Sequence, residues 1–578
     1  MVSFHNYLLS LQPKMIKMAK TIVFFLLFFL SEAVCAQTGF PKYEVRGVWL
    51  TTIGGIDWPH VYARNPHSIE QQKKELIQIL DKLQRAGINT VLLQTRVRAT
   101  TIYPSVYEPW DGCLSGIPAV SPGYDALQFA ISEAHRRGME LHAWVVTLPV
   151  GKWNSVGCRR LRQRFPKMVR RIGQEGYLNP ERSETGDYLS QICAEITGNY
   201  DVDGIHLDYI RYPETWPLRV SRVDGRAYIT GIVRKIHRAV KSLKPWVKLS
   251  CAPIGKADDL SRYSSNGWNA YTRVCQDAQG WLSEGIMDEL FPMVYFRGNQ
   301  FYPFVLDWKE QSNDRIISIG LGTYMLSPQE SNWPAETLVR QMSFLREAHL
   351  GCTHFRSRFL TDNTKGIYDY VSRTLNAYPA LVPPMTWYGY RPPSAPQNLR
   401  ATETHSQSVL TWEQGSDLSD GDYLLYNIYI SHSCPVDVSD VRNLVAARVQ
   451  TTRVVVPPGF HYAVCAVDRY GNESLPATWP VSCSEDSDER AICLLPTDGT
   501  SVRLPADVLK QTDAEYVVAE TLQGTIVCFW KTASELPVAH LPEGMFVIKA
   551  LGHKGKAHRL GYLLLRRTSH LTPHTDEI

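Results

Sequence analysis

Between residues 43 and 380, short apolar runs alternate with longer stretches in which apolar residues recur at every third or fourth position. Runs of the first kind are typical of buried strands, and stretches of the second kind are typical of amphipathic helices. Their alternation predicts successive β/α units that build a parallel sheet. The expected strands span residues 45–52, 89–97, 140–148, 202–210, 247–253, 287–296, 316–324 and 351–359. The clearest helices span residues 68–86, 124–137, 186–199, 225–243 and 334–349.

Eight such units predict an α/β fold in which residues 43–380 form a (β/α)8 TIM barrel. The turns from helix to strand are short, as at Ala86-Gly87-Ile88, whereas the longest connections follow the second, third and fifth strands. In this fold the loops at the C-terminal ends of the strands carry the chemistry. We therefore expect the long loops to surround the functional site.

The pattern changes after the barrel. Residues 381–396 are rich in proline and predict an extended, semi-rigid linker. Short alternating runs with turn signals follow, and they predict two small all-β domains at residues 397–485 and 490–570. The first domain resembles a fibronectin type III module through Trp412 and the run YAVCAVDRYGN at residues 462–472. The second resembles, more distantly, the β-sandwiches that serve exported bacterial enzymes as secretion or attachment modules, although a plain accessory domain fits the same pattern.

The first 36 residues have the features of a cleaved export signal. Lys14, Lys17 and Lys20 precede an apolar run at residues 21–30, and small residues follow in Ala33-Val-Cys-Ala36. The run is too short to span a bilayer as a helix of the mature chain. A lipoprotein anchored at Cys35 is the alternative, but Glu32 stands where that signal needs an aliphatic residue. We therefore expect an exported protein, periplasmic or at the cell surface.

Charge and cysteine spacing exclude several classes of partner and cofactor. The net charge of +4 is small for 578 residues and no basic run stands out, so neither nucleic acid nor an anionic membrane is expected as a partner. No Cys-x-x-Cys pair and no Gly-x-Gly-x-x-Gly after a strand occur, so we expect no metal and no nucleotide cofactor. Cys113 and Cys158, in two long loops on the same side of the barrel, are a plausible disulfide pair, whereas Cys193, Cys251 and Cys275 are expected to be buried thiols.

The most informative run is VDGIHLDYIRYP at residues 202–213, in which an apolar strand ends in polar and aromatic residues. A carboxylate, a cation and two aromatic residues at a strand end are typical of an active-site wall in a barrel. One reaction that such a wall can serve is glycoside hydrolysis, which needs two carboxyl groups, one on each side of the scissile bond. We predict that Asp208 is the nucleophile or general base and that Arg211 keeps it ionised. Asp203, at the buried start of the same strand, is predicted to be structural. The alternative is a capped strand with an ordinary ion pair.

The second carboxyl group is less clearly marked. Asp277 ranks first because the long region after the fifth strand could bring it over the site, Asp57 ranks second and Glu214 third. Each of them could instead cap a helix or a turn. The end of the seventh strand, at residues 320–325, holds no carboxylate, which argues against a nucleophilic Glu there.

Polar and aromatic residues near other strand ends are candidates for binding sugar. They are Gln94, Arg96, His142, Trp144, His206, Tyr209, Arg211 and Tyr295. His206 and Asp208 are two residues apart on one strand and should face the same side. For any one of these residues, a buried polar group with internal hydrogen bonds is the alternative.

Several of these motifs together resemble the glycosyl hydrolase-like 10 family of exported bacterial proteins. The resemblance is carried, in the same order, by residues 44–51, 89–96, 141–144, 203–213 and 291–295. It implies a barrel that cleaves glycans, with peptidoglycan strands that have lost their stem peptides as the substrate. Two alternatives remain open: a glycan-binding barrel without catalysis, because fold alone does not imply activity, and an adhesive or assembly protein that acts through its β-domains. The sequence does not indicate an oligomeric state.

Overall fold

The computed structural model describes residues 40–261, 263, 267–389, 391–404, 407–415, 423–480, 500–504, 514–521, 526–533, 535–541, 544–552 and 557–565. The chain forms two compact units, residues 1–482 and 483–578. The predicted export signal lies outside the described residues. No helix in the described part of the chain is both long and apolar enough to cross a membrane.

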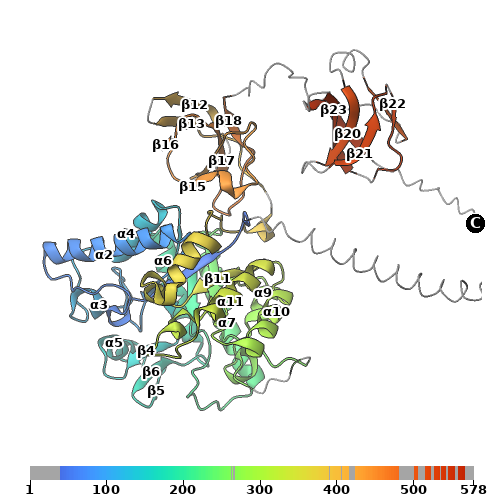
Figure 1. Ribbon diagram of the computed structural model, residues 1–578. Coiled ribbons are helices and arrows are strands. Elements are labelled where there is room, and N and C mark those ends of the chain that lie inside the picture. Colours follow the sequence, from blue (N-terminus) through green and yellow to red (C-terminus); the bar gives the residue numbers. More distant parts are fainter. Residues whose placement is uncertain are drawn as a thin grey trace, which may run out of the picture. The chain divides into compact units, whose positions relative to one another are not determined.

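The first unit contains a closed barrel of eight parallel strands surrounded by helices, which confirms the predicted TIM barrel (Figure 1). Its strands follow one another around the barrel in chain order, and the last pairs with the first. They are β1 (Arg46–Leu50), β2 (Thr90–Arg96), β3 (Glu140–Val146), β7 (Gly204–Asp208), β8 (Lys248–Cys251), β9 (Glu289–Leu290), β10 (Ile316–Leu321) and β11 (Gly351–His354). Each lies within one of the eight expected ranges.

Strand β9 is much shorter than the apolar run that predicts it. Pro292 lies two residues after its end and has no N–H to donate to a neighbouring strand. The chain continues through isolated bridges that join Met293 to Ile254 and to Gly320. An apolar run therefore gives the position of a barrel strand but not the length of its hydrogen-bonded part.

The helices pack their apolar faces on the outward side of the strands. They include α2 (Pro66–Arg85), α3 (Gly112–Ser115), α4 (Ala126–His135), α6 (Ser183–Asn199), α7 (Arg222–Leu243), α8 (Ala270–Arg273), α9 (Ala278–Ser283), α10 (Tyr302–Glu310), α11 (Ala335–Glu347), α12 (Ser357–Thr361) and α13 (Ile367–Tyr370). Asn65 caps α2 by accepting from the Ser68 N–H at 2.9 Å, and Pro66 begins the helix. Asp125 caps α4 by accepting from the Gln128 N–H at 3.0 Å.

A small subdomain, residues 149–178, follows β3 and is called the insert below. Its three strands form an antiparallel sheet beside one helix: β4 (Pro149–Lys152), α5 (Val156–Arg164), β5 (Val169–Ile172) and β6 (Glu175–Leu178). Figure 1 shows these elements together at one end of the barrel, away from strands β12–β18 of the same unit. The long loop predicted after the third strand thus has a fold of its own.

After the barrel, two antiparallel sheets face each other. One has the order β12-β13-β16 and the other β15-β14-β17-β18. Their strands are β12 (Gln397–Glu403), β13 (Ser408–Glu413), β14 (Leu425–Ser431), β15 (Leu444–Val449), β16 (Arg453–Val456), β17 (His461–Val467) and β18 (Ala477–Trp479). Trp412, Ile428 and Val464 lie in their shared core. The arrangement is the expected all-β domain, and its likeness to fibronectin type III stays a prediction.

The second unit has a four-stranded antiparallel sheet of order β21-β20-β23-β24 and a two-stranded sheet of β19 and β22. Its strands are β19 (Ser501–Arg503), β20 (Ala514–Thr521), β21 (Ile526–Lys531), β22 (Glu535–Pro537), β23 (Gly544–Gly552) and β24 (Ala557–Leu565). Val517, Trp530 and Ile548 belong to a core of its own. The described part of the second unit is therefore all-β, as predicted.

Ion pairs join the sandwich of β12–β18 to the N-terminal ends of the barrel strands. Arg448 donates to Asp203 and, at 3.1 Å, to Glu140, and Arg469 lies 2.8 Å from Asp201. Asp203 also accepts from the Leu141 N–H and lies 2.8 Å from His135 Nε2. Burial alone would raise the pKa of Asp203, but Arg448, His135 and Arg469 hold it well below its usual range. The structural role predicted for Asp203 is confirmed.

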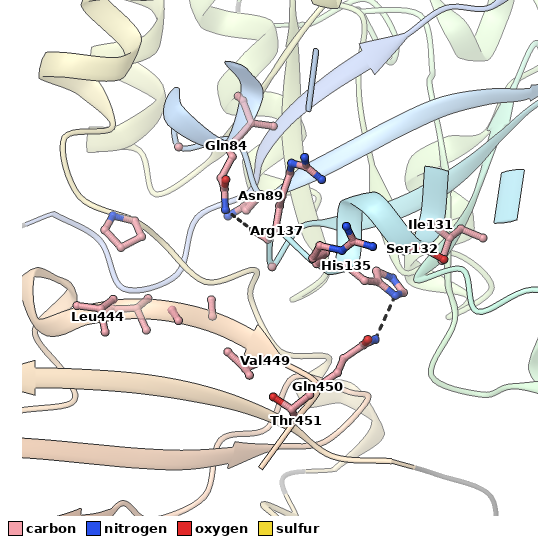
Figure 2. Close-up of a pocket in the computed structure, with 18 of the residues that line it drawn as sticks. Gln84, Asn89, Ile131, Ser132, His135, Arg137, Leu444, Val449, Gln450 and Thr451 are labelled. Atoms are coloured by element: carbon pink, nitrogen blue, oxygen red, sulfur yellow. Dashed lines mark hydrogen bonds between the residues drawn. The ribbon is translucent and has the colours of Figure 1, made fainter. Parts of the chain in front are cut away.

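A pocket of about 720 Å³ lies between this sandwich and the ends of α2 and α4. Figure 2 shows Gln84, His135 and Arg137 on one side and residues of β15 and its turn on the other, with Gln450 3.4 Å from His135. None of the predicted site residues lines it. It is a gap between packed domains at the end of the barrel opposite Asp208.

The cysteines correct one prediction. Cys113 and Cys158 are both free and buried, so the expected disulfide between them is wrong. The two cysteines lie in different loops that pack separately. Cys113 belongs to α3, whereas Cys158 belongs to α5 and packs against Gly176 of β6, where an added Cβ would lie 2.5 Å from the Cys158 sulfur. Cys193, Cys251 and Cys275 are buried free thiols, as expected, and Cys434 is disulfide-bonded.

Candidate active site

Asp208 is the last residue of β7, at the C-terminal face of the barrel. The residue is 8% exposed, and its carboxylate accepts from two N–H groups. Trp144 Nε1 donates to Oδ2 at 3.1 Å, and the backbone N–H of Tyr209 donates to Oδ1 at 2.8 Å. Both carboxylate oxygens therefore have a fixed direction before any substrate arrives.

The charges around Asp208 act on it in opposite directions. Burial raises its pKa, whereas Arg211 and the two N–H donors oppose that rise, and Glu214 adds to it. Arg211 is buried and donates to Glu214 Oε1 at 2.7 Å, while 44% of the Glu214 side chain is exposed. The site thus contains two carboxylates, the buried Asp208 and the exposed Glu214. The Arg211 guanidinium is hydrogen-bonded to Glu214, and its charge lowers the pKa of Asp208.

The residue that follows Asp208 has an unusual backbone conformation. Tyr209 adopts φ = 54°, in the left-handed region that an aromatic residue rarely enters. Its ring lies 4.4 Å from the Arg211 guanidinium carbon, measured to the ring centroid. Strain of this kind costs on the order of 1–3 kcal/mol and gathers at functional sites. The sharp turn places a half-buried aromatic ring beside the carboxylate.

His206 lies below Asp208 on the same side of β7, which confirms that the two residues face the barrel interior together. The Trp49 indole N–H donates to His206 Nε2 at 3.1 Å, so the other ring nitrogen carries the proton and meets Ser250 Oγ at 3.0 Å. Burial holds the pKa of His206 well below its usual range. His206 is therefore neutral, has a hydrogen bond at each ring nitrogen, and lies beneath Asp208 in the barrel interior.

Tyr295 belongs to an aromatic wall beyond β9. Its ring stacks on Phe355 with centroids 5.6 Å apart and meets Tyr324 edge to face at 5.7 Å. Burial raises the pKa of Tyr295 well above its usual value, and its hydroxyl has no hydrogen-bond partner among the described residues. Aromatic faces of this kind suit the flat faces of sugars.

Two of the predicted sugar-binding residues, Gln94 and Arg96, are hydrogen-bonded within the protein, and His142 is hydrogen-bonded at Nε2 but has no partner at Nδ1 within the described residues. Gln94 Oε1 accepts from the N–H groups of Thr52 and Ile53 at 3.0 and 2.9 Å. Arg96 is fully buried and donates twice from Nε to Glu108, at 3.0 and 2.9 Å. His142 is fully buried as well, and its Nε2 lies 3.1 Å from Glu140 Oε2. Their contact with sugar stays a prediction, and these bonds favour the structural alternative.

The candidates for the second acid fall in different places. Asp277 caps α9 by accepting from the Gly280 N–H at 3.1 Å. Asp57 is buried, accepts from Thr51 N and Oγ1 at 3.0 and 2.8 Å, and pairs with Arg356. Glu214, ranked third, is the candidate whose charge raises the pKa of Asp208. The capping alternative therefore holds for Asp277, and Glu214 becomes the first choice.

Below the site, the barrel interior holds acids that the sequence analysis did not single out. Glu289 is fully buried with His142 Nδ1 4.0 Å away, and neither of its oxygens has a hydrogen bond within the described chain. Gly204 admits the His142 ring, since a Cβ there would lie 2.5 Å from it. Burial raises the pKa of Glu289 to about 7; His142 and Lys248 oppose the rise, and Glu140 and Asp288 add to it.

We expect Glu289→Gln to flatten the pH dependence of stability. The folded-state pKa of Glu289 lies above that of a free Glu, so its contribution is present below about pH 4.5 and is lost as pH rises through about 7. Such a shift corresponds to on the order of 3 kcal/mol. Urea unfolding at pH 5 and pH 8 measures the difference, with the exposed Glu347→Gln as control. An unchanged pH dependence in Glu289→Gln would contradict the assignment.

The insert is a second feature that the sequence analysis missed. Residues 149–178 contain eight Lys or Arg and one Glu, so they carry a net charge of +7, against −3 for the rest of the chain. Averaging over the whole chain hides this run, and the statement that no basic run stands out is wrong. A count in a window of 30 residues would have found it.

These features define a class: a TIM barrel with a positioned carboxylate and aromatic rings at its C-terminal face, as in glycosidases. The family model of the glycosyl hydrolase-like 10 family matches residues 44–224 and 222–325. The chain belongs to this family. It therefore has a role in hydrolysing or binding glycans.

Curated relatives support this family membership. Glycosyl hydrolase YngK of Bacillus subtilis (strain 168) is 30% identical over 403 residues, which are 64% of this chain and 78% of the relative. Glycosyl hydrolase DigH of Escherichia coli (strain K12) is 31% identical over 296 residues, 45% of this chain and 67% of the relative. Among solved structures, α-L-fucosidase isoenzyme 2 from Paenibacillus thiaminolyticus aligns with a TM-score of 0.39 and 14% identity over 57% of this chain and 48% of its own. That alignment adds nothing to the barrel that the strand pairing establishes.

Proposed function

We propose that this protein is an exported glycoside hydrolase that cleaves an extended glycan, namely peptidoglycan strands without stem peptides. The observation that carries the proposal is the Asp208 carboxylate, buried at the end of β7 and aimed by the N–H groups of Trp144 and Tyr209. A carboxylate oriented in this way is prepared to attack an anomeric carbon or to activate a water.

In this proposal Glu214 is the partner of Asp208 and protonates the leaving oxygen. Its exposure lets it exchange protons with solvent, and Arg211 links it to the buried acid. Arg211 favours the ionised form of Asp208, which a nucleophile or base needs. Tyr209 and Tyr295 are half-buried and offer ring faces to the sugar. Retention corresponds to carboxyl groups roughly 5 Å apart and inversion to roughly 6.5–9.5 Å.

Export rests on two observations of different kinds. The first 36 residues have the sequence of a cleaved signal. Cys434 is disulfide-bonded, and stable disulfides belong to oxidising compartments outside the cytosol. Both fit a glycan of the cell envelope as substrate.

The test is the release of soluble oligosaccharides from purified peptidoglycan, with and without its stem peptides. We expect the mature protein to release fragments from the peptide-free strands and Asp208→Asn to release none. Asp362→Asn, an exposed acid paired with Arg358 on the barrel surface, is the matched control and should keep full activity. Retained binding to both substrates without any release would favour the glycan-binding alternative.

A further inference from the structure

The insert places its positive charges on the surface without compensating negative ones. Six of its eight cations are exposed: Lys152, Arg159, Arg160, Arg164, Lys167 and Arg171. Within the described residues, none of the eight forms an ion pair with a carboxylate, and Glu175 is the only acid of the insert. Like charges on so small a subdomain repel one another, and an anionic ligand would relieve that repulsion.

The insert borders the site rather than standing apart from it. Gly151 of β4 packs against Arg98, with a Cβ there only 3.5 Å from the Arg98 side chain. The charge of Arg98, which is itself exposed, lowers the burial-raised pKa of Tyr209, the neighbour of Asp208. On the other side, Arg170 lies 4.7 Å over the ring of Trp216, in the loop that follows β7. The positive surface therefore begins beside the catalytic face.

Aromatic rings are interleaved with these cations. The Trp153 ring lies 3.8 Å from the guanidinium of Arg162 and 5.6 Å from that of Arg171. Arg162 also donates to the Trp153 carbonyl at 3.0 Å, which fixes its position. A surface of stacked rings and fixed guanidinium groups suits a ligand that has flat sugar faces and acidic groups together.

We propose that the insert is a binding subsite for the carboxylates of an anionic glycan, and that it selects strands without stem peptides. This inference rests on the proposed function. In peptidoglycan the lactyl carboxyl group of each muramic acid is capped as an amide by the stem peptide. Removing the peptide leaves one carboxylate on every disaccharide, so the free strand is a regular polyanion that the insert can hold across several repeats.

The position of the charges favours a glycan over the other polyanions. They adjoin the same face as Asp208 and the aromatic wall, where a strand held by the insert would continue toward the catalytic carboxylate. A nucleic acid or an anionic membrane would need no such proximity. These two partners are therefore outcomes of the test rather than part of the proposal.

The test uses four exposed cations whose side chains have no partner in the described chain. The variant Lys152→Gln, Arg159→Gln, Arg160→Gln and Lys167→Gln removes four charges from the insert. A matched variant removes four exposed charges from the outer helices α2, α7 and α11: Lys74→Gln, Arg85→Gln, Arg238→Gln and Arg340→Gln. Both sets are made in the full mature chain carrying Asp208→Asn, so that binding is measured without cleavage.

Binding is measured on soluble peptide-free glycan, on the same glycan with its carboxyl groups converted to amides by ethanolamine, and on phosphatidylglycerol vesicles and single-stranded RNA. We expect the insert variant to bind the free-acid glycan about tenfold more weakly. The helix variant should be unchanged, and the amidated glycan should bind both proteins equally weakly. Equal binding of the free-acid glycan by both variants would overturn the proposal, as would an insert-dependent loss confined to vesicles or RNA.

Hydrolysis is followed separately with Asp208 intact, so that the two proposals can fail independently. The insert variant should raise KM on free-acid glycan and leave kcat unchanged, because its residues do not touch the reacting atoms. Insert-dependent binding without any hydrolysis by the native protein would refute the enzyme and keep the subsite. Hydrolysis with the same KM in the native protein and in the insert variant would support the enzyme and refute the subsite.

Discussion

Asp208→Asn is expected to lower kcat/KM on peptide-free glycan by at least about a thousandfold while the protein stays folded. Asn has nearly the same size and keeps an acceptor for the Trp144 or Tyr209 N–H, but it removes the negative charge. Azide added to Asp208→Ala should restore part of the turnover if the missing group is a nucleophile. Activity within tenfold of the native protein would show that another carboxylate performs the chemistry.

The pH profile gives a second view of the same residue. In the proposed mechanism Asp208 acts in its ionised form, so activity should fall as pH drops through its pKa. Arg211 lowers that pKa, so Arg211→Gln should move the acid limb of kcat/KM to higher pH. Glu214 raises it, so Glu214→Gln should move the acid limb of the remaining activity to lower pH. The exposed Arg358→Gln is the control, and parallel shifts in all three variants would contradict the assignment.

Arg96→Met is expected to destabilise the protein by about 3–5 kcal/mol, because it leaves the buried Glu108 carboxylate without its cation. Burial opposes the charge of Arg96, yet Glu108 and Tyr188 keep its pKa above the usual value. Tyr188 donates to the same carboxylate at 2.8 Å. Urea unfolding at neutral pH measures the loss.

The double variant Arg96→Met with Glu108→Leu separates a structural role from sugar binding. Removing both charges should recover most of the lost stability, since no buried charge is then unpaired. Activity should return with it if Arg96 only supports the loop after β2. A double variant that is stable but binds glycan poorly would establish the sugar contact that the sequence predicts.

The fold could be predicted from the sequence because each barrel strand is an apolar run buried on both faces. The same regularity placed Asp208 at a strand end and His206 beneath it. What the pattern could not give is the partner of each polar side chain. Arg96 and Gln94 lie at a strand end as expected. However, Arg96 is hydrogen-bonded to Glu108, and Gln94 accepts from the backbone N–H of Thr52. Such partners come from distant loops that periodicity does not connect.

Two further gaps have physical causes. The first turn of a helix has free N–H groups, so an Asp before an apolar stretch serves as a cap as readily as a catalyst, and Asp277 does so. The insert was missed because its +7 is partly offset by −3 in the rest of the chain, and the remaining +4 is small for 578 residues. The charge of a surface is a local property, and a sum over the chain does not measure it.

The arginines that the sandwich extends to the barrel decide how this protein can be divided. Without Arg448 and Arg469, a fragment that stops at the proline-rich linker would leave Asp203 and Glu140 inside the barrel floor with fewer cations to neutralise them. The barrel therefore depends on this particular sandwich, and a replacement module would need cations at the same two places to neutralise Asp203 and Glu140. Fragments of the barrel for crystallisation or engineering should end after β18 rather than before β12.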